Sequence, residues 1–366
     1  MSRAAAPRVE PNRNTAQSVP EWMSPPRRAR ALFLTLAFLA PWAAFSDGSR
    51  SGLLLDSSEA EAVLALAAGA ATGKAPDESA WNGLFETVPF LRLEKRELAL
   101  QRPFPRDGFR QFVLSPDLAG RALALRRTLE SWRKTDLDAI AARIRPYLPA
   151  TAMLRASIYP VIKPRSNSFV FEADSDPAIF LYLDPEQSPE AFANTVAHEL
   201  HHIGLASLQA AYEKRIEALP ANARHAARWL GALGEGLAVL AAAGSPDVHP
   251  LRDFPEADRR RWDQDMQSID QLVAQVDRFL LDVAEGGFTR PEVADRVAFT
   301  FFGYRGPWYT VGYHAGARVE KRFGRAVLLE CIADPRRLLA RFNEVAQQDG
   351  SAGFSPALLA AVKDER

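Results

Sequence analysis

The chain has 366 residues, of which 47% are hydrophobic and 25% charged, a balance typical of folded globular proteins and not of disordered, collagen-like or coiled-coil chains. Its 45 basic residues equal its 45 acidic residues, so no excess of positive charge is available to bind a nucleic-acid backbone. The single cysteine, Cys331, excludes an intramolecular disulfide and a thiolate zinc cluster. The chemistry must therefore come from histidine, carboxylate, tyrosine or serine side chains.

The first predicted element is an export signal. Three arginines at positions 27–30 precede an uncharged apolar run over residues 31–45, which ends at small side chains. This pattern is typical of a secretory signal peptide, whereas a membrane anchor needs about 20 apolar residues and would here be interrupted by Pro41. We expect residues 1–46 to be an N-terminal extension and signal peptide, with Met23 as an alternative start. The mature protein would then be periplasmic or extracellular in a bacterium, with no stable membrane insertion.

Residues 47–149 are expected to be helical, because apolar side chains recur there at spacings of three and four. No linker rich in glycine and serine follows, so this helical N-terminal region should pack on the remainder of the chain. Turn residues then separate three short runs rich in β-branched and aromatic residues. These runs predict a small sheet with strands at Ala156–Ile162, Ser168–Glu172 and Ala178–Leu183.

The chain after Pro185 is expected to be helical again. An apolar stripe from Trp262 to Val283 predicts one buried helix face there, with a packing role. The predicted fold is therefore α+β and predominantly helical. A small sheet lies between a helical N-terminal region and a helical C-terminal body.

The chemically distinctive segment is His-Glu-Leu-His-His at residues 198–202. On a helix, His198 and His202 would lie on one face about 6 Å apart, where both imidazoles can bind one Zn²⁺. Glu199 is rotated by about 100° from His198, so its carboxylate would lie beside the metal and could take a proton from the attacking water. Ser188 is a favourable N-cap for this helix, which would directly follow the third predicted strand.

Glu235 is the best candidate for a third metal ligand. A three-histidine site would need a histidine where Leu208 stands. Glu235, 33 residues after His202, is the only charged residue in the apolar stretch 229–246, and an uncompensated buried carboxylate would cost several kcal/mol. Nearby glycines would let two helix backbones approach closely. The alternatives are a glutamate at a helix end that reaches solvent, or a membrane span of about 18 residues.

Other acidic and histidine residues are weaker candidates as ligands. Four of them lie in charged surroundings that are expected to be exposed: Glu213, Glu217, Asp247 and His249. Two more, His201 and His225, are expected to support the site or to lie at the surface. Hydrolysis also needs a donor to the oxyanion, and the segment 304–316 offers Tyr309, then Tyr313, then His314, in that order of preference.

The segments HELHHIG and GEGLA together resemble the gluzincin branch of zinc metallopeptidases. More closely, the chain is similar to a bacterial family of zinc-dependent peptidases, in these two motifs and in segments such as NSFVFEAD and YTVGYHAGARVEKRFG. The resemblance implies a zincin-like domain over residues 150–366, with one Zn²⁺ held by His198, His202 and Glu235 and with Glu199 as general base. Val239 departs from the gluzincin pattern, because an aspartate that orients a ligand histidine often stands there.

The function predicted from the sequence is zinc-dependent hydrolysis of a peptide or protein substrate. The strand at Ala178–Leu183, expected at the sheet edge, would hold an extended peptide by added-strand pairing. Two alternatives stay open. One is a non-catalytic helical envelope protein with a relic metal site, and the other is a zinc hydrolase that acts on a non-peptide amide or ester.

Overall fold

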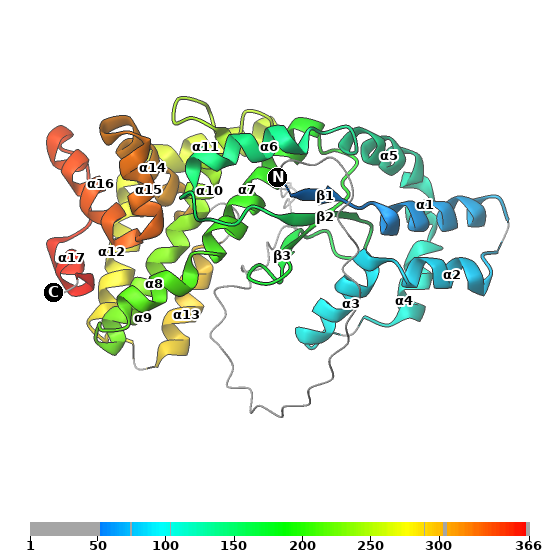
Figure 1. The fold of residues 1–366 in the computed structure, drawn as a ribbon, viewed down its shortest axis with the longest axis horizontal. Coiled ribbons are helices and arrows are strands. Elements are labelled where there is room, and N and C mark those ends of the chain that lie inside the picture. The colour runs from blue at the N-terminus through cyan, green and yellow to red at the C-terminus, as the bar shows by residue number, and fades with distance from the viewer. Residues whose placement is uncertain (1–51, 74, 103, 289, 303–305, 364–366) are drawn as a thin grey trace, which may run out of the picture.

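The structure, a computed structural model, describes residues 52–363 except 74, 103, 289 and 303–305. The predicted signal peptide at residues 1–46 lies outside the described residues. Figure 1 shows the small sheet in the middle of the molecule, with the first helices on one side and a larger helical body on the other. The predominantly helical α+β fold with a small sheet is therefore confirmed.

The N-terminal region is helical, as predicted. Asp77, Ser115 and Asp136 cap three of its helices by accepting a hydrogen bond from the backbone N–H three residues later, which satisfies one of the free donors at each helix start. The helices of this region are α1 (Ser58–Ala71), α2 (Glu78–Phe85), α3 (Val88–Ala99), α4 (Arg106–Val113), α5 (Pro116–Trp132), α6 (Leu137–Ile144) and the short 3₁₀ helix η2 (Arg145–Tyr147).

The sheet contains the three predicted strands, with ends that differ by one residue at most, and one further strand. Its strands are β1 (Leu53–Leu55), β2 (Ala156–Val161), β3 (Phe169–Phe171) and β4 (Ala178–Tyr182), in the spatial order β1-β2-β4-β3. β1, β2 and β4 are parallel, and β3 is antiparallel to β4. The prediction that residues 178–183 form an edge strand is wrong, because β3 folds back along the outer side of β4. Thus β3, and not β4, is the edge on this side.

The chain after β4 is helical. The stripe from Trp262 to Val283 is divided between two helices that meet at Ser268, so the prediction of one continuous helix face is wrong. The helices are α7 (Pro189–Ala206), α8 (Gln209–Ile216), α9 (Ala221–Leu230), η3 (Gly231–Leu233), α10 (Gly234–Ala243), α11 (Glu256–Gln267), α12 (Ile269–Ala284), α13 (Pro291–Thr300), α14 (Pro307–Phe323), α15 (Arg325–Ala333), α16 (Pro335–Asp349) and α17 (Pro356–Val362).

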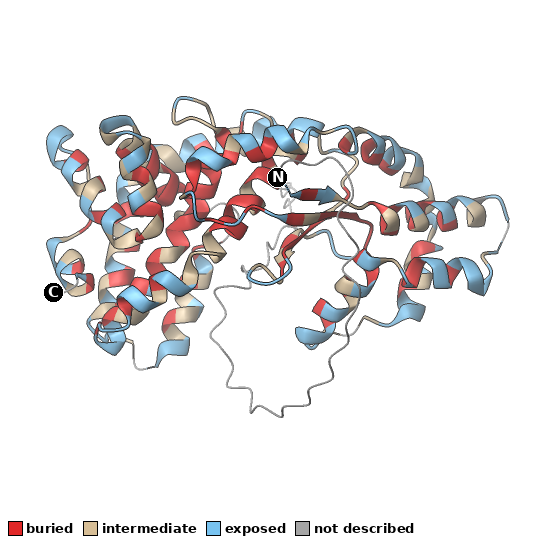
Figure 2. Cartoon of the chain, viewed as in Figure 1, coloured by how far each residue is buried: buried red, intermediate tan, exposed pale blue. Residues whose placement is uncertain are grey.

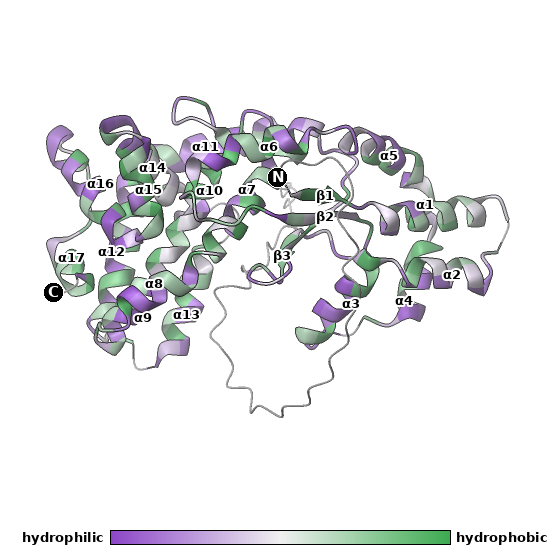
Figure 3. Cartoon of the chain, in the orientation of Figure 1, coloured by the Kyte–Doolittle hydropathy of each residue, from purple (hydrophilic) through white to green (hydrophobic). Residues whose placement is uncertain are grey.

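One hydrophobic cluster connects the two helical parts, because its buried members run from Leu53 to Val362. Figures 2 and 3 show the buried positions along the inward sides of the helices and sheet, where the hydrophobic residues also gather. Among the described residues, one helical stretch, Ala221–Ala243, is long and apolar enough to cross a membrane, but 89% of its apolar window is buried inside the protein. It is therefore accounted for as a core helix.

Helices α10 and α14 approach each other so closely that glycines are required at their contact. A Cβ atom added to Gly236 would lie 2.0 Å from the backbone nitrogen of Tyr313, and one added to Gly312 would lie 2.2 Å from the carbonyl oxygen of Leu233. The sequence predicts that glycines near Glu235 let its helix approach the histidine helix closely, and there a Cβ atom added to Gly234 would lie 3.0 Å from the Leu205 side chain of α7. At Gly236 the partner is α14, which brings the Tyr309 segment against the helix that carries Glu235.

Gly236→Ala is expected to destabilise the protein by about 3 kcal/mol or more, because the added methyl group meets backbone atoms that cannot move independently. Gly83→Ala is the matched control: Gly83 lies in α2 with nothing within 4 Å of the added Cβ, so the change should be neutral or slightly stabilising. Urea unfolding of both variants measures the difference. Equal stability of the two variants would show that the α10–α14 contact is looser than described.

Candidate metal centre

The helix that carries the histidines begins and packs as its sequence dictates. The Ser188 side chain accepts a hydrogen bond from the backbone N–H of Ala191 at 3.1 Å, and Pro189 occupies the first turn, where a missing N–H costs nothing. Val196, Leu200 and Ile203 are fully buried and form its inward face. With β4 directly before it, α7 is fixed at both its N-terminus and its apolar face.

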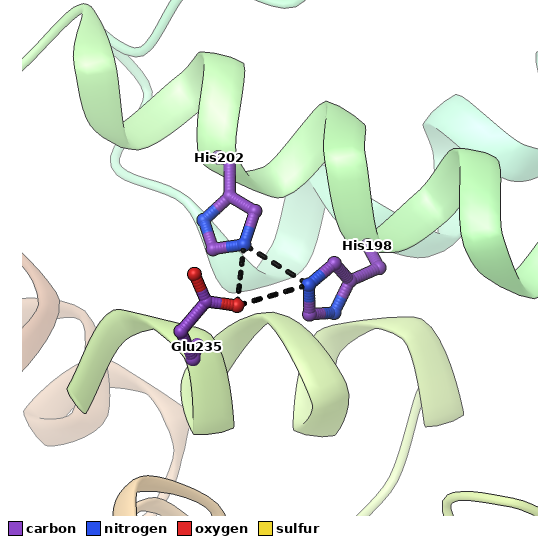
Figure 4. Close-up of side chains that lie close together, drawn as sticks. All are labelled: His198, His202 and Glu235. Carbon is purple, nitrogen blue, oxygen red and sulfur yellow. Dashed lines mark hydrogen bonds and ion pairs between the residues drawn. The ribbon is translucent and has the colours of Figure 1, made fainter. Parts of the chain in front are cut away.

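Three side chains converge where α7 faces α10 (Figure 4). The Nε2 atoms of His198 and His202 are 3.0 Å apart, and Oε2 of Glu235 lies 3.3 Å from the first and 3.1 Å from the second. Among the described residues, this is the group of three histidine, cysteine or acidic side chains that could hold a metal ion. The sequence prediction that Glu235 approaches the two histidines is confirmed in position.

The three donor atoms fit a zinc ion. Bonds of about 2.0–2.1 Å in a tetrahedron place neighbouring ligand atoms about 3.3 Å apart, close to the three separations observed here. Hydrogen bonds alone explain the triangle poorly, because each imidazole nitrogen has one in-plane lone pair or one proton and cannot make well-directed hydrogen bonds to two partners at once. Two imidazole nitrogens and a carboxylate oxygen also form a known catalytic zinc set, which leaves a fourth position open.

The group is reached from the His198 side. The His202 and Glu235 side chains are only 5% and 2% exposed, whereas the His198 side chain is 17% exposed. Glu199 is half-buried beside it. The group is therefore open to solvent along the face of α7 that carries His198 and Glu199.

Burial and charge shift the proton affinities of the group. Burial acts to raise the pKa of Glu235, but His202 and His198 outweigh it, so this pKa lies well below its usual range. Burial likewise acts to lower the pKa of His202, and the Glu235 carboxylate more than compensates and raises it. Burial raises the pKa of Glu199, with the two histidines opposing the shift. Glu235 is therefore held as a carboxylate, whereas Glu199 has an increased affinity for a proton.

Of the three candidate oxyanion donors, Tyr309 is the one whose ring contacts the metal-site residues. It stacks on the His198 ring, with centroids 6.2 Å apart and planes 15° from parallel. The Tyr313 ring instead meets Trp262 edge-on at 5.3 Å. The His314 ring meets Phe342 of α16 at 5.5 Å. The structure thus brings the first-ranked residue to the site and directs the other two towards other helices.

The weaker ligand candidates are engaged elsewhere. His201 is fully buried, with Nε2 3.3 Å from the carbonyl oxygen of Tyr147, so it fastens α7 to η2. Burial lowers its pKa to about 3, which keeps it neutral. The other pairs lie outside the metal group: His225 with Asp295, Glu213 with Arg228, Asp247 with Lys321 and His249 with Asp263.

Two polar residues near the face of α7 that carries His198 and Glu199 are not predicted from the sequence: Thr195 and Gln187. Thr195 lies one turn before Glu199, and its hydroxyl accepts a hydrogen bond from Nε2 of Gln187 at 3.1 Å. Helical spacing could have placed Thr195 beside Glu199. Gln187 lies in the loop between β4 and α7, and its position follows only from the three-dimensional structure.

The fold and the site together define a zincin-like protein, in which a small sheet is followed by a helix with His-Glu-x-x-His and a later glutamate completes the site. A family model described as "Putative zinc dependent peptidase (DUF5700)" matches residues 120–351, and the chain belongs to this family. The match begins within α5, so it includes the last helices of the N-terminal region. No curated protein and no solved structure matches the chain.

Proposed function

We propose that the protein is a zinc metallopeptidase of the gluzincin type, with one Zn²⁺ per chain held by His198, His202 and Glu235. The observation that carries this proposal is the triangle of ligand atoms, with separations of 3.0, 3.1 and 3.3 Å, next to the carboxylate of Glu199. The family to which the chain belongs supports the same chemistry at a coarser level.

In this proposal the bound zinc supplies Lewis acidity, which polarises the scissile carbonyl and lowers the pKa of the attacking water. Glu199 accepts a proton from that water and delivers it to the leaving amine; its raised pKa suits a group that must hold the proton between these steps. Tyr309, stacked on His198, donates a hydrogen bond to the oxyanion that forms on the carbonyl oxygen.

We further propose that an extended substrate pairs with β3. Among the described residues, β3 pairs only with β4, so its outer edge offers backbone donors and acceptors to an added strand. β3 also contacts α7, the helix that carries the catalytic residues. In this proposal β3 takes the role first expected for residues 178–183, because the sheet order places β4 in the interior.

The test is elemental analysis of the purified mature protein, followed by digestion of a broad peptide library with and without a chelator. We expect about one zinc per chain and cleavage that the chelator abolishes and added zinc restores. Zinc-free protein with no activity would support the non-catalytic envelope protein. Zinc-loaded protein that cleaves esters or small amides, but no peptide, would support the non-peptide hydrolase.

Tyr309→Phe is expected to lower kcat by about a hundredfold with little change in KM or zinc content. The substitution keeps the ring against His198 and removes only the hydroxyl that would stabilise the oxyanion. Steady-state kinetics on a peptide from the library measures the effect. A larger loss in Tyr313→Phe than in Tyr309→Phe would transfer the role to Tyr313.

The same proposal places the enzyme outside the cytoplasm, in the periplasm or the surrounding medium, with peptides or proteins as its substrates. The arginine-flanked apolar run before residue 46 supports export. Sequencing of the N-terminus of the exported protein checks both the cleavage and its position.

A further inference from the structure

The partly exposed face of α7, which carries His198 and Glu199, also carries the polar residue Thr195. At 100° per residue, Thr195, His198, Glu199 and His202 all lie within an arc of about 100°. Of these, the first three are half-buried, whereas Val196, Ala197 and Leu200 on the other faces are fully buried. Thr195 therefore lies on the same partly exposed face of α7 as the proposed general base, one helical turn away.

The hydroxyl of Thr195 makes two hydrogen bonds, one of which holds the amide of Gln187. Thr195 donates to the carbonyl oxygen of Ala191 at 2.9 Å and accepts from Nε2 of Gln187 at 3.1 Å. In the described part of the chain, the Gln187 side chain makes no further hydrogen bond to protein, and Oε1 is not among the buried unpartnered atoms, so it can accept from a bound molecule in place of solvent. The side chain is half-buried.

Two hydrogen bonds hold the backbone of Gln187 in place. Its carbonyl oxygen accepts from Nε1 of Trp132 at 3.5 Å, and its N–H donates to the carbonyl of Asp184 at 3.2 Å. Trp132 is fully buried and stacks on Phe192 of α7 at 4.3 Å. The amide is thus fixed before any ligand arrives, which reduces the entropy lost on binding.

The surrounding charge favours a donor over an anion. The segment 184–190, which contains Gln187, also contains Asp184, Glu186 and Glu190 and has no basic residue; of these acidic residues, Asp184 interacts with Arg121 of α5. A carboxylate beside Oε1 would be repelled by this segment, and its oxygens could not donate to the amide oxygen. A lysine, arginine or glutamine side chain carries no negative charge and can donate a hydrogen bond to Oε1.

We propose that Gln187, anchored by Thr195, determines substrate specificity: its Oε1 accepts a hydrogen bond from an N–H or O–H donor in the side chain of a substrate residue that flanks the scissile bond. The inference rests on the proposed peptidase function. One turn of helix places Thr195 about 6 Å from Glu199, which is within the length of two residues of an extended peptide.

The experiment uses a peptide that the zinc-loaded wild type cleaves, varied at each of the two positions that flank the cleaved bond. Lysine is compared with norleucine, which has a similar apolar stem, and glutamine with glutamate. At one position we expect kcat/KM to be about tenfold higher for lysine than for norleucine, and higher for glutamine than for glutamate. Competition in one mixture, followed by mass spectrometry, gives the ratios directly.

Gln187→Met is expected to bring the lysine-to-norleucine ratio close to one, and Gln187→Glu to raise it above the wild-type value. Thr195→Val should lower the ratio, because it removes the anchor of the amide and keeps the volume of the side chain. Gln348→Met is the control: its amide accepts from Arg322 at 2.9 Å on the exposed side of α16, so the ratio should not change.

Cleavage by the wild type with no donor preference, or an unchanged ratio in Gln187→Met and Gln187→Glu, would overturn the specificity proposal alone. If Gln187→Met does not fold, the direction of the change in Gln187→Glu decides. Zinc-loaded wild type that cleaves no peptide would overturn the proposed function itself, together with this inference.

Discussion

Glu199→Gln is expected to leave zinc bound and to lower kcat/KM for peptide hydrolysis by about a thousandfold. The amide keeps the size of the side chain but cannot accept the proton of the attacking water, and general-base catalysis commonly contributes 10²- to 10⁴-fold. Zinc should be retained because the proposed ligands are His198, His202 and Glu235. Elemental analysis and single-turnover kinetics on the same preparation measure both quantities.

Glu190→Gln is the matched control, because Glu190 lies in the first turn of the same helix and is exposed. Its activity should stay within about twofold of the wild type. Turnover near the wild-type rate in Glu199→Gln would contradict the assignment of the general base. Loss of zinc from this variant would instead indicate that Glu199 takes part in metal binding.

The parts of the site that the sequence predicts are those that depend on local spacing. His198, Glu199 and His202 belong to one helix, whose start is set by Ser188 and Pro189, so helical geometry fixes their relative directions. Glu235 is 33 residues further along, and its place is predicted on energetic grounds: a lone charge in a buried apolar helix needs a compensating partner. This cost identifies the residue but does not predict the direction of its side chain.

The parts that the sequence does not predict depend on contacts between distant segments. β1 is three leucines, which have no alternation to read, and it becomes a strand only by pairing with residues 156–158. The interior place of β4 depends on the return of β3 along its outer side. Likewise, the placement of Gln187 depends on Trp132, 55 residues earlier in the chain.

Glu235→Ala is expected to reduce the zinc content from about one per chain to a small fraction of that value, with loss of hydrolysis. Removal of one of three protein ligands leaves two imidazoles, which hold a divalent ion much more weakly. Glu235→Gln separates charge from packing: it fills the same buried space without the carboxylate, so it should also lose zinc. Zinc titration followed by equilibrium dialysis gives the affinities.

The matched control is Glu213→Gln, which removes a carboxylate that pairs with Arg228 outside the metal group. It should bind zinc as the wild type does.

In the presence of chelator, Glu235→Gln should stay folded, because glutamine can still hydrogen-bond His202 across the 3.1 Å contact. Far-ultraviolet circular dichroism then distinguishes loss of the metal from loss of the fold. One zinc per chain in both Glu235 variants would place the third ligand elsewhere. Glu235 is only 1% exposed, and a buried carboxylate without a positively charged partner would be costly, so a cation held together with His198 and His202 would account for its place in an apolar helix.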